Sequence, residues 1–168
     1  SKYANTDNIS SLQLLKETND IHNNSHIGIG HTRWATHGKK TDTNAHPHQD
    51  NDQLIYLSHN GIIENYIELK EMLVGEGYQF YTETDTEVIA NLIAYYLNSM
   101  EESNMEQVLT KLNNTLNGTW ALTILYLNQP DTLYLTKKGS PLLVGYNDSY
   151  AIIASESIGF YNYINDKK

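Results

Sequence analysis

The chain has 168 residues, 39% of them hydrophobic and 18% charged, which is enough apolar material for one folded domain and too much for a disordered segment. Its formal net charge of -9 argues against a nucleic-acid partner, because that affinity depends on clustered cations. The absence of cysteine excludes disulfides, thiolate metal sites and a thiol nucleophile within these residues.

The sequence also lacks the patterns that direct a chain into or across a membrane. It contains no apolar run of 18 or more residues, and its N-terminus does not have the basic, apolar and small-residue succession of a signal peptide. We therefore expect a soluble, cytoplasmic protein without a membrane partner.

The first quarter of the chain predicts one helix, one short strand and a long loop. Apolar residues at helical spacing over 9–21 predict an amphipathic helix, capped by Asp7 or Ser10. Isoleucine and glycine alternate over 27–30, which favours a short strand closely approached by another backbone or a ligand. The polar, histidine-bearing stretch 31–49 is typical of a functional loop.

The next segment predicts a strand that ends in a turn. An apolar run over 54–59 is typical of a strand, and it is followed directly by Asn60 and Gly61. Both of these residue types tolerate positive φ, so we expect the chain to bend there.

Three capping-box patterns predict three helices in the middle of the chain. The first pattern is Asn65 to Glu68, with the glycines at 75 and 77 ending the helix; the second is Thr84 to Glu87; the third is Ser103 to Glu106.

The last third of the chain predicts strands joined by short turns. The strand-like runs are 119–127, 132–137, 142–146 and 149–155. Neighbouring runs are close enough to form antiparallel hairpins. Central helices followed by hairpins indicate an α+β layered fold rather than alternating βαβ units.

The loop at 30–38 is the densest polar cluster of the chain and could bind an anion. Arg33 offers a planar fork of donors suited to a carboxylate, and Thr36 and His37 could add hydrogen bonds to the same group. The alternative is a structural loop in which Arg33 pairs with a surface acid and Trp34 is part of the core.

Two further positions could complete a site for an amino acid. The side-chain amide of Asn60 and the backbone N–H of Gly61 could form an oxyanion hole, although an ordinary hairpin turn explains the same pair. Asp85 falls in the first turn of a predicted helix, where a carboxylate normally caps. Alternatively, it could bind an ammonium group, so that Arg33 and Asp85 together recognise a zwitterion.

Five histidines raise the possibility of a zinc site, because neutral imidazole is a common zinc ligand. They are His31, His37, His46, His48 and His59. Their spacing matches no helical metal motif, so we expect satisfied loop histidines and no metal.

Five segments, in this order, resemble one known family. They are GHTRWATHG at 30–38, NAHPH at 44–48, SHNGIIENY at 58–66, ETDTEVIANL at 83–92 and GSPLLVG at 139–145. Together they are similar to the glutaminase domain of glutamine–fructose-6-phosphate amidotransferases, which are class II (N-terminal-nucleophile) glutamine amidotransferases. The resemblance runs from about residue 27 to residue 155.

The resemblance implies a fold, a domain organisation and partners. The fold is the N-terminal-nucleophile hydrolase sandwich, a four-layer αββα arrangement of antiparallel sheets, here incomplete at both ends. Residues 1–168 would be a single glutaminase-type domain fragment without the N-terminal cysteine segment and without the isomerase domain. The implied ligands are glutamine and, through that isomerase domain, fructose 6-phosphate; no cofactor is expected, and the parent protein would be a homo-oligomer.

The resemblance also implies which residues bind glutamine. Arg33, with Thr36 and His37, would hold the α-carboxylate, and Asp85 would hold the α-ammonium group. Trp34 would lie on a loop that closes over the bound glutamine.

The same resemblance assigns Asn60 and Gly61 to the oxyanion hole. The family's nucleophile is an N-terminal cysteine that uses its own α-amine as the general base. This chain instead begins Ser1-Lys2-Tyr3, and Ser1 is no substitute because the family's first strand is missing. We therefore expect glutamine recognition and an oxyanion hole without the nucleophile, and an inactive chain on its own. The alternative is a non-catalytic module that binds glutamine or another protein.

Overall fold

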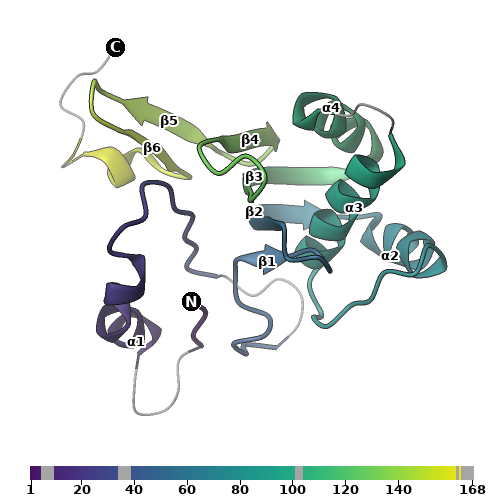
Figure 1. The fold of residues 1–168 in the computed structure, drawn as a ribbon, viewed down its shortest axis with the longest axis horizontal. Helices are drawn as coiled ribbons and strands as arrows, with labels where there is room; N and C mark the ends of the chain where they lie inside the picture. The colour runs from purple at the N-terminus through teal and green to yellow at the C-terminus, as the bar shows by residue number, and fades with distance from the viewer. Residues whose placement is uncertain (5–9, 34–38, 101–103, 162, 164–168) are drawn as a thin grey trace.

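A computed structural model describes residues 1–4, 10–33, 39–100, 104–161 and 163, and its centre is a four-stranded antiparallel sheet (Figure 1). The strand order is β1-β2-β3-β4. The bounds are β1 His48–Gln49, β2 Ile55–Ile63, β3 Gly118–Tyr126 and β4 Leu133–Lys138. The long pair β2 and β3 are in register along their whole length, with Asn60 opposite Ala121.

Three helices form one layer beside this sheet: α2 Tyr66–Gly75, α3 Asp85–Ser99 and α4 Met105–Thr115, with α3 packed on the strands and the other two against α3 (Figure 1). The central helix α3 is buried from Asp85 through Ala94, because it touches the sheet and both neighbouring helices. Its apolar residues form one core with the inward-facing residues of β2 and β3. None of the helices in the described part is long and apolar enough to cross a membrane.

The strand β2 has two faces with different surroundings, and this decides where the site lies. Ile55, Leu57 and Ile63 are at most 1% exposed and belong to the core under α3. Because successive side chains alternate across a strand, Tyr56 and Asn60 lie on the opposite face.

The remaining elements lie outside this sheet and helix layer. A separate antiparallel hairpin is formed by β5 Leu143–Tyr146 and β6 Ala151–Ala154, followed by the 3-10 helix η2 Ser157–Phe160. Near the N-terminus, α1 Ser11–Glu17 leads into the 3-10 helix η1 Asn19–His22 and stands apart from the other helices (Figure 1). The hairpins and the mixed layers confirm the predicted α+β fold.

The turn predicted at Asn60 and Gly61 is wrong, because β2 continues through both residues to Ile63. Gly61 does have a positive φ of 134°. Its function is close approach between strands: a Cβ at this position would lie 2.1 Å from the carbonyl oxygen of Thr119 on β3. A glycine that looks like a turn signal therefore serves strand pairing.

The strand predicted over 27–30 is also wrong, since these residues are in neither a strand nor a helix. A Cβ at Gly28 or Gly30 would meet no atom within 4 Å, so neither glycine is required by a close neighbour. The predicted loop 31–49 is interrupted at its end by β1, which starts at His48.

The helix predicted over 9–21 is shorter than expected and is not part of the core. It begins after Ser10, whose hydroxyl accepts from the Gln13 backbone N–H, and the other cap candidate, Asp7, lies outside the described residues. Leu12 and Leu15 on its apolar side are 59% and 39% exposed.

The three predicted capping boxes differ from the caps in the structure. Asn65 precedes α2, but its side chain does not cap that helix. It accepts from the Asn117 backbone N–H and donates to the Thr115 carbonyl, which joins the start of α2 to the end of α4. The box of α4 is one residue later than predicted, at Asn104 and Gln107.

The box at Thr84 and Glu87 is half confirmed. The Thr84 hydroxyl accepts from the Glu87 backbone N–H, as a cap does. The Glu87 carboxylate, however, accepts from the backbone N–H groups of Tyr81 and Thr82 instead of from Thr84. It therefore fixes the loop that leads into α3.

Candidate functional site

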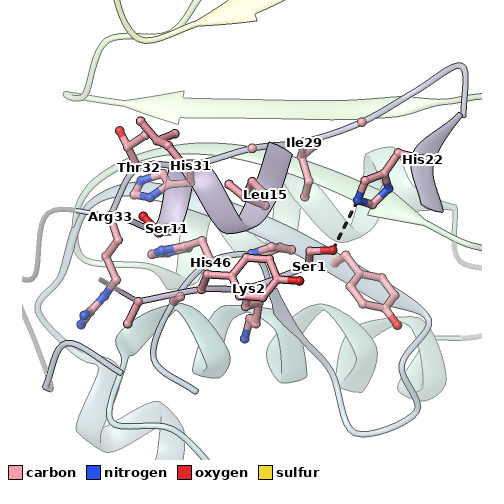
Figure 2. A pocket seen from close by; sticks show the side chains of 18 of the residues that line it. Ser1, Lys2, Ser11, Leu15, His22, Ile29, His31, Thr32, Arg33 and His46 are labelled. Atoms are coloured by element: carbon pink, nitrogen blue, oxygen red, sulfur yellow. Dashed lines mark hydrogen bonds between the residues drawn. The ribbon is translucent and has the colours of Figure 1, made fainter. Parts of the chain in front are cut away.

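A cavity of about 870 Å³ lies on the sheet face opposite the helices. Its floor includes Tyr56 of β2 and Leu125 of β3, which are partners in the strand register. Its walls are formed by the first four residues, α1 and the segment 25–33. Figure 2 shows His31, Thr32 and Arg33 at one end of the cavity and His22 near Ser1 at the other.

Arg33 lies on the cavity wall. Its Nη1 donates to the Lys39 carbonyl oxygen at 3.1 Å, which fixes one edge of the guanidinium group. The other three residues predicted in this loop, Trp34, Thr36 and His37, lie outside the described residues.

Asn60 and Gly61 sit consecutively on β2, with the Asn60 side chain on the cavity face. The Oδ1 atom of Asn60 lies 2.7 Å from Nε2 of His31. This hydrogen bond connects the strand to the segment that carries Arg33. This pairing is not predictable from local sequence, because the two residues are 29 positions apart and no local pattern links them.

Asp85 is the first residue of α3 and is only 3% exposed. Its Oδ2 accepts from the Ile63 backbone N–H at 2.9 Å, and its Oδ1 lies 3.8 Å from Nδ1 of His59. The cap of α3 is Thr84, so capping does not explain Asp85. The carboxylate instead joins the helix N-terminus, where negative charge is favoured, to the end of β2.

A buried threonine joins the histidines to Asp85. The Thr86 hydroxyl lies 3.1 Å from Nε2 of His46 and 3.2 Å from Nδ1 of His59. It also donates to Oδ1 of Asp85 at 3.4 Å. The His46 ring packs on the His31 ring with 4.2 Å between centroids. A chain of contacts therefore runs from Asn60 through the histidines to Asp85.

The spacing of histidines and threonines in the sequence offers a signal for this chain of contacts. Histidines stand at 46 and 48, and threonines stand at 84 and 86. In the structure His46 contacts Thr86 and His48 contacts Thr84, at 3.2 Å for the second pair. The first histidine thus contacts the second threonine, and the second histidine contacts the first threonine, as in two segments that run antiparallel.

Three histidines of this cluster, His31, His46 and His48, are neutral at neutral pH because burial lowers the pKa of each ring. Burial lowers the pKa of His46 to about 2 and the pKa of His48 to about 3. Burial also lowers the pKa of His31. Across the described residues, no three His, Asp or Glu side chains are placed to hold a metal ion.

The chain is similar to known proteins in sequence and in fold. The profile of a family described as "Glutamine amidotransferase domain" matches residues 31–162, which include residues 31–33 of the cavity wall, β2 and α3. The chain belongs to this glutamine amidotransferase family. The fold, the predicted resemblance and the family agree.

Similar proteins extend the match along most of this amidotransferase chain. Glutamine–fructose-6-phosphate aminotransferase (isomerizing) of Thermococcus kodakarensis is 49% identical over 138 residues, covering 82% of this chain and 23% of the relative. The enzyme of the same name from Clostridium acetobutylicum is 45% identical over 156 residues, covering 93% of this chain and 25% of the relative. The chain thus spans about a quarter of the length of these relatives.

A solved structure shows the same fold. Glutamine phosphoribosylpyrophosphate amidotransferase from B. subtilis, complexed with ADP and GMP, superposes with a TM-score of 0.61 at 27% sequence identity. The match covers 77% of this chain and 28% of that chain. The amidotransferase chain therefore has the N-terminal-nucleophile hydrolase-type fold with antiparallel sheets.

Proposed function

We propose that this chain is the glutamine-hydrolysing part of a cytoplasmic, homo-oligomeric amidotransferase that makes glucosamine 6-phosphate from fructose 6-phosphate and glutamine. Residues 1–168 would form one glutaminase-type domain, and a separate isomerase domain would bind the sugar phosphate. The observation that carries the proposal is the position of Asn60, on the cavity face of β2 and directly before a glycine. The family match over residues 31–162 supports it.

In this proposal glutamine is bound at both ends of its amino-acid part, by Arg33 of the cavity wall and by Asp85, which does not line the cavity. Arg33, together with Thr36 and His37, binds the α-carboxylate, and Trp34 closes over the ligand. The placement of Arg33 on the cavity wall supports this. Asp85 holds the α-ammonium group, with its carboxylate oriented by the Ile63 backbone N–H.

The chemistry requires a thiolate that the chain does not contain, since it has no cysteine. We propose that a cysteine outside these residues attacks the side-chain amide carbon of glutamine, with its α-amine accepting the thiol proton. The C–N bond then breaks and ammonia leaves with a proton from that amine. Water hydrolyses the resulting thioester to glutamate. Asn60 and the Gly61 N–H stabilise the oxyanion in both steps.

Calorimetry with glutamine tests recognition on the 168-residue chain. We expect binding that is weakened about 10- to 100-fold by Arg33→Ala, because a charge-assisted hydrogen bond is lost, and by Asp85→Asn, which keeps the shape but removes the charge. Lys16→Ala on the exposed helix α1 is the matched cation control and should leave binding unchanged.

Hydrolysis is tested on the natural protein that carries this sequence. Glutamine and fructose 6-phosphate should yield glutamate and glucosamine 6-phosphate. If this protein binds glutamine but hydrolyses none, the chain is a non-catalytic glutamine-binding module. If it neither binds nor hydrolyses glutamine, the proposal is wrong.

A further inference from the structure

An asparagine that stabilises an oxyanion must be held in one of its two amide orientations. Only Nδ2 of the amide can donate, and Oδ1 would repel a developing negative charge. The two orientations have almost the same shape, so packing alone distinguishes them poorly. A neighbouring group that donates to Oδ1 is needed to select the productive orientation of Asn60.

His31 is placed to be that group. Its Nε2 lies 2.7 Å from Oδ1 of Asn60, a short hydrogen bond for a neutral pair. The ring is held from the other side by His46, at a centroid separation of 4.2 Å. Both rings come from segments that line the cavity.

We propose that His31 is a positioning residue that fixes the Asn60 amide through a hydrogen bond from Nε2–H to Oδ1. This inference rests on the proposed function, because it takes Asn60 as a donor to the oxyanion. It adds the requirement that the ring proton of neutral His31 is on Nε2. With hydrogen on Nδ1 alone, Nε2 would accept from Nδ2 of Asn60, and Oδ1 would face the oxyanion.

The ionisable groups near His31 do not remove the need for a hydrogen on its Nε2. The ionisable groups around the His31 ring are the imidazoles of His46 and His59 and the guanidinium of Arg33. Burial lowers the pKa of His31, so the ring is neutral at the pH of the assay and carries a single N–H.

Substitution of His31 in the natural protein gives the first test. His31→Leu keeps a side chain of similar bulk but removes the donor, and we expect kcat for glutamine hydrolysis to fall about 10- to 100-fold with KM within about twofold. His31→Gln can place an amide N–H near the position of Nε2, and should restore kcat to within about fivefold of the unsubstituted protein. His31→Glu offers only acceptors and should be no faster than His31→Leu.

A double substitution shows whether His31 acts through Asn60. Asn60→Ala should lower kcat about 10²- to 10³-fold, as loss of an oxyanion donor does. Adding His31→Leu to Asn60→Ala should cause no further loss beyond about twofold, because the amide to be oriented is gone. Ser58→Ala, two residues earlier on the same face of β2, is the packing control and should leave kcat unchanged.

A tautomer measurement on the 168-residue chain tests the proposal without hydrolysis. Long-range ¹H–¹⁵N correlations of the His31 ring should show hydrogen on Nε2 at pH 7.5, and the Nε2 signal should shift in Asn60→Ala. Hydrogen on Nδ1 alone would overturn the proposal.

The outcomes separate this inference from the proposed function. Full hydrolysis by Asn60→Ala removes the oxyanion role and the inference with it. Slow Asn60→Ala together with full-speed His31→Leu overturns only the positioning role. Equal and additive losses from both substitutions also overturn it, since His31 then acts independently of Asn60.

Discussion

At the scale of single residues, Gly61 has a positive φ that is typical of a turn, although it lies within a paired strand. Its φ of 134° is compatible with a turn, yet it pairs with Trp120 in the middle of β2 and β3. We expect Gly61→Ala to lower the free energy of unfolding by about 3 kcal/mol or more, because the new Cβ would overlap the Thr119 carbonyl. Urea unfolding followed by circular dichroism measures this.

Gly28→Ala is the matched control for that experiment. A Cβ at Gly28 meets nothing within 4 Å, so the free energy of unfolding should change by no more than about 0.5 kcal/mol. Equal effects at Gly28 and Gly61 would contradict the close approach of β3 as the cause.

At the scale of secondary-structure elements, Asn65 acts between helices rather than within one. Asn65→Ala removes two hydrogen bonds, to Asn117 and Thr115, and leaves their backbone groups to find water. We expect a loss of about 2 kcal/mol in the free energy of unfolding. Asn128→Ala, at an exposed amide that donates only to the Tyr126 hydroxyl among the described contacts, should cost no more than about 0.5 kcal/mol.

The elements predicted from sequence succeed or fail according to how local their causes are. The helix starting near Thr84 and the four late strands depend on periodicity and turn residues close by, and the structure confirms them. The bend at Asn60 and the box at Asn65 failed because their true partners, in β3 and at the end of α4, are more than 45 residues away in sequence.

The candidate site divides in the same way. Arg33, Asn60 and Asp85 were predicted as site residues from residue types and from a resemblance carried by short motifs, and these roles stay predictions. His31 as the partner of Asn60, and Thr86 as the partner of two histidines, were missed because only the folded chain brings them together.

At the scale of the whole molecule, the buried histidines predict acid sensitivity. The folded pKa of His46 is about 2 and that of His48 is about 3, both below the unfolded value near 6.5. Below pH 6.5 the unfolded chain therefore binds more protons than the folded chain, and stability falls as pH falls. At pH 5 we expect His46 and His48 each to lower the free energy of unfolding by about 2 kcal/mol relative to neutral pH.

Urea unfolding at pH 7.5, 6.5, 5.5 and 5.0 measures this dependence. His48→Gln should remove about half of the part of the slope below pH 6.5 that comes from His46 and His48, because glutamine binds no proton in this range. The exposed His26 provides the control, and His26→Gln should leave the slope unchanged. A stability that is flat between pH 6.5 and 5 would show that these rings are not neutral and buried in solution.

The two-sided character of β2 limits how the protein can change by insertion and deletion. A strand repeats every two residues, so loss of one residue between positions 55 and 60 would exchange its faces. The Asn60 amide would then turn toward α3, and the imidazole of His59 would turn toward the cavity. Single substitutions remain open where the strand is exposed, as at Ile62, which is 42% exposed. The length of this strand is therefore far less free to vary than its composition.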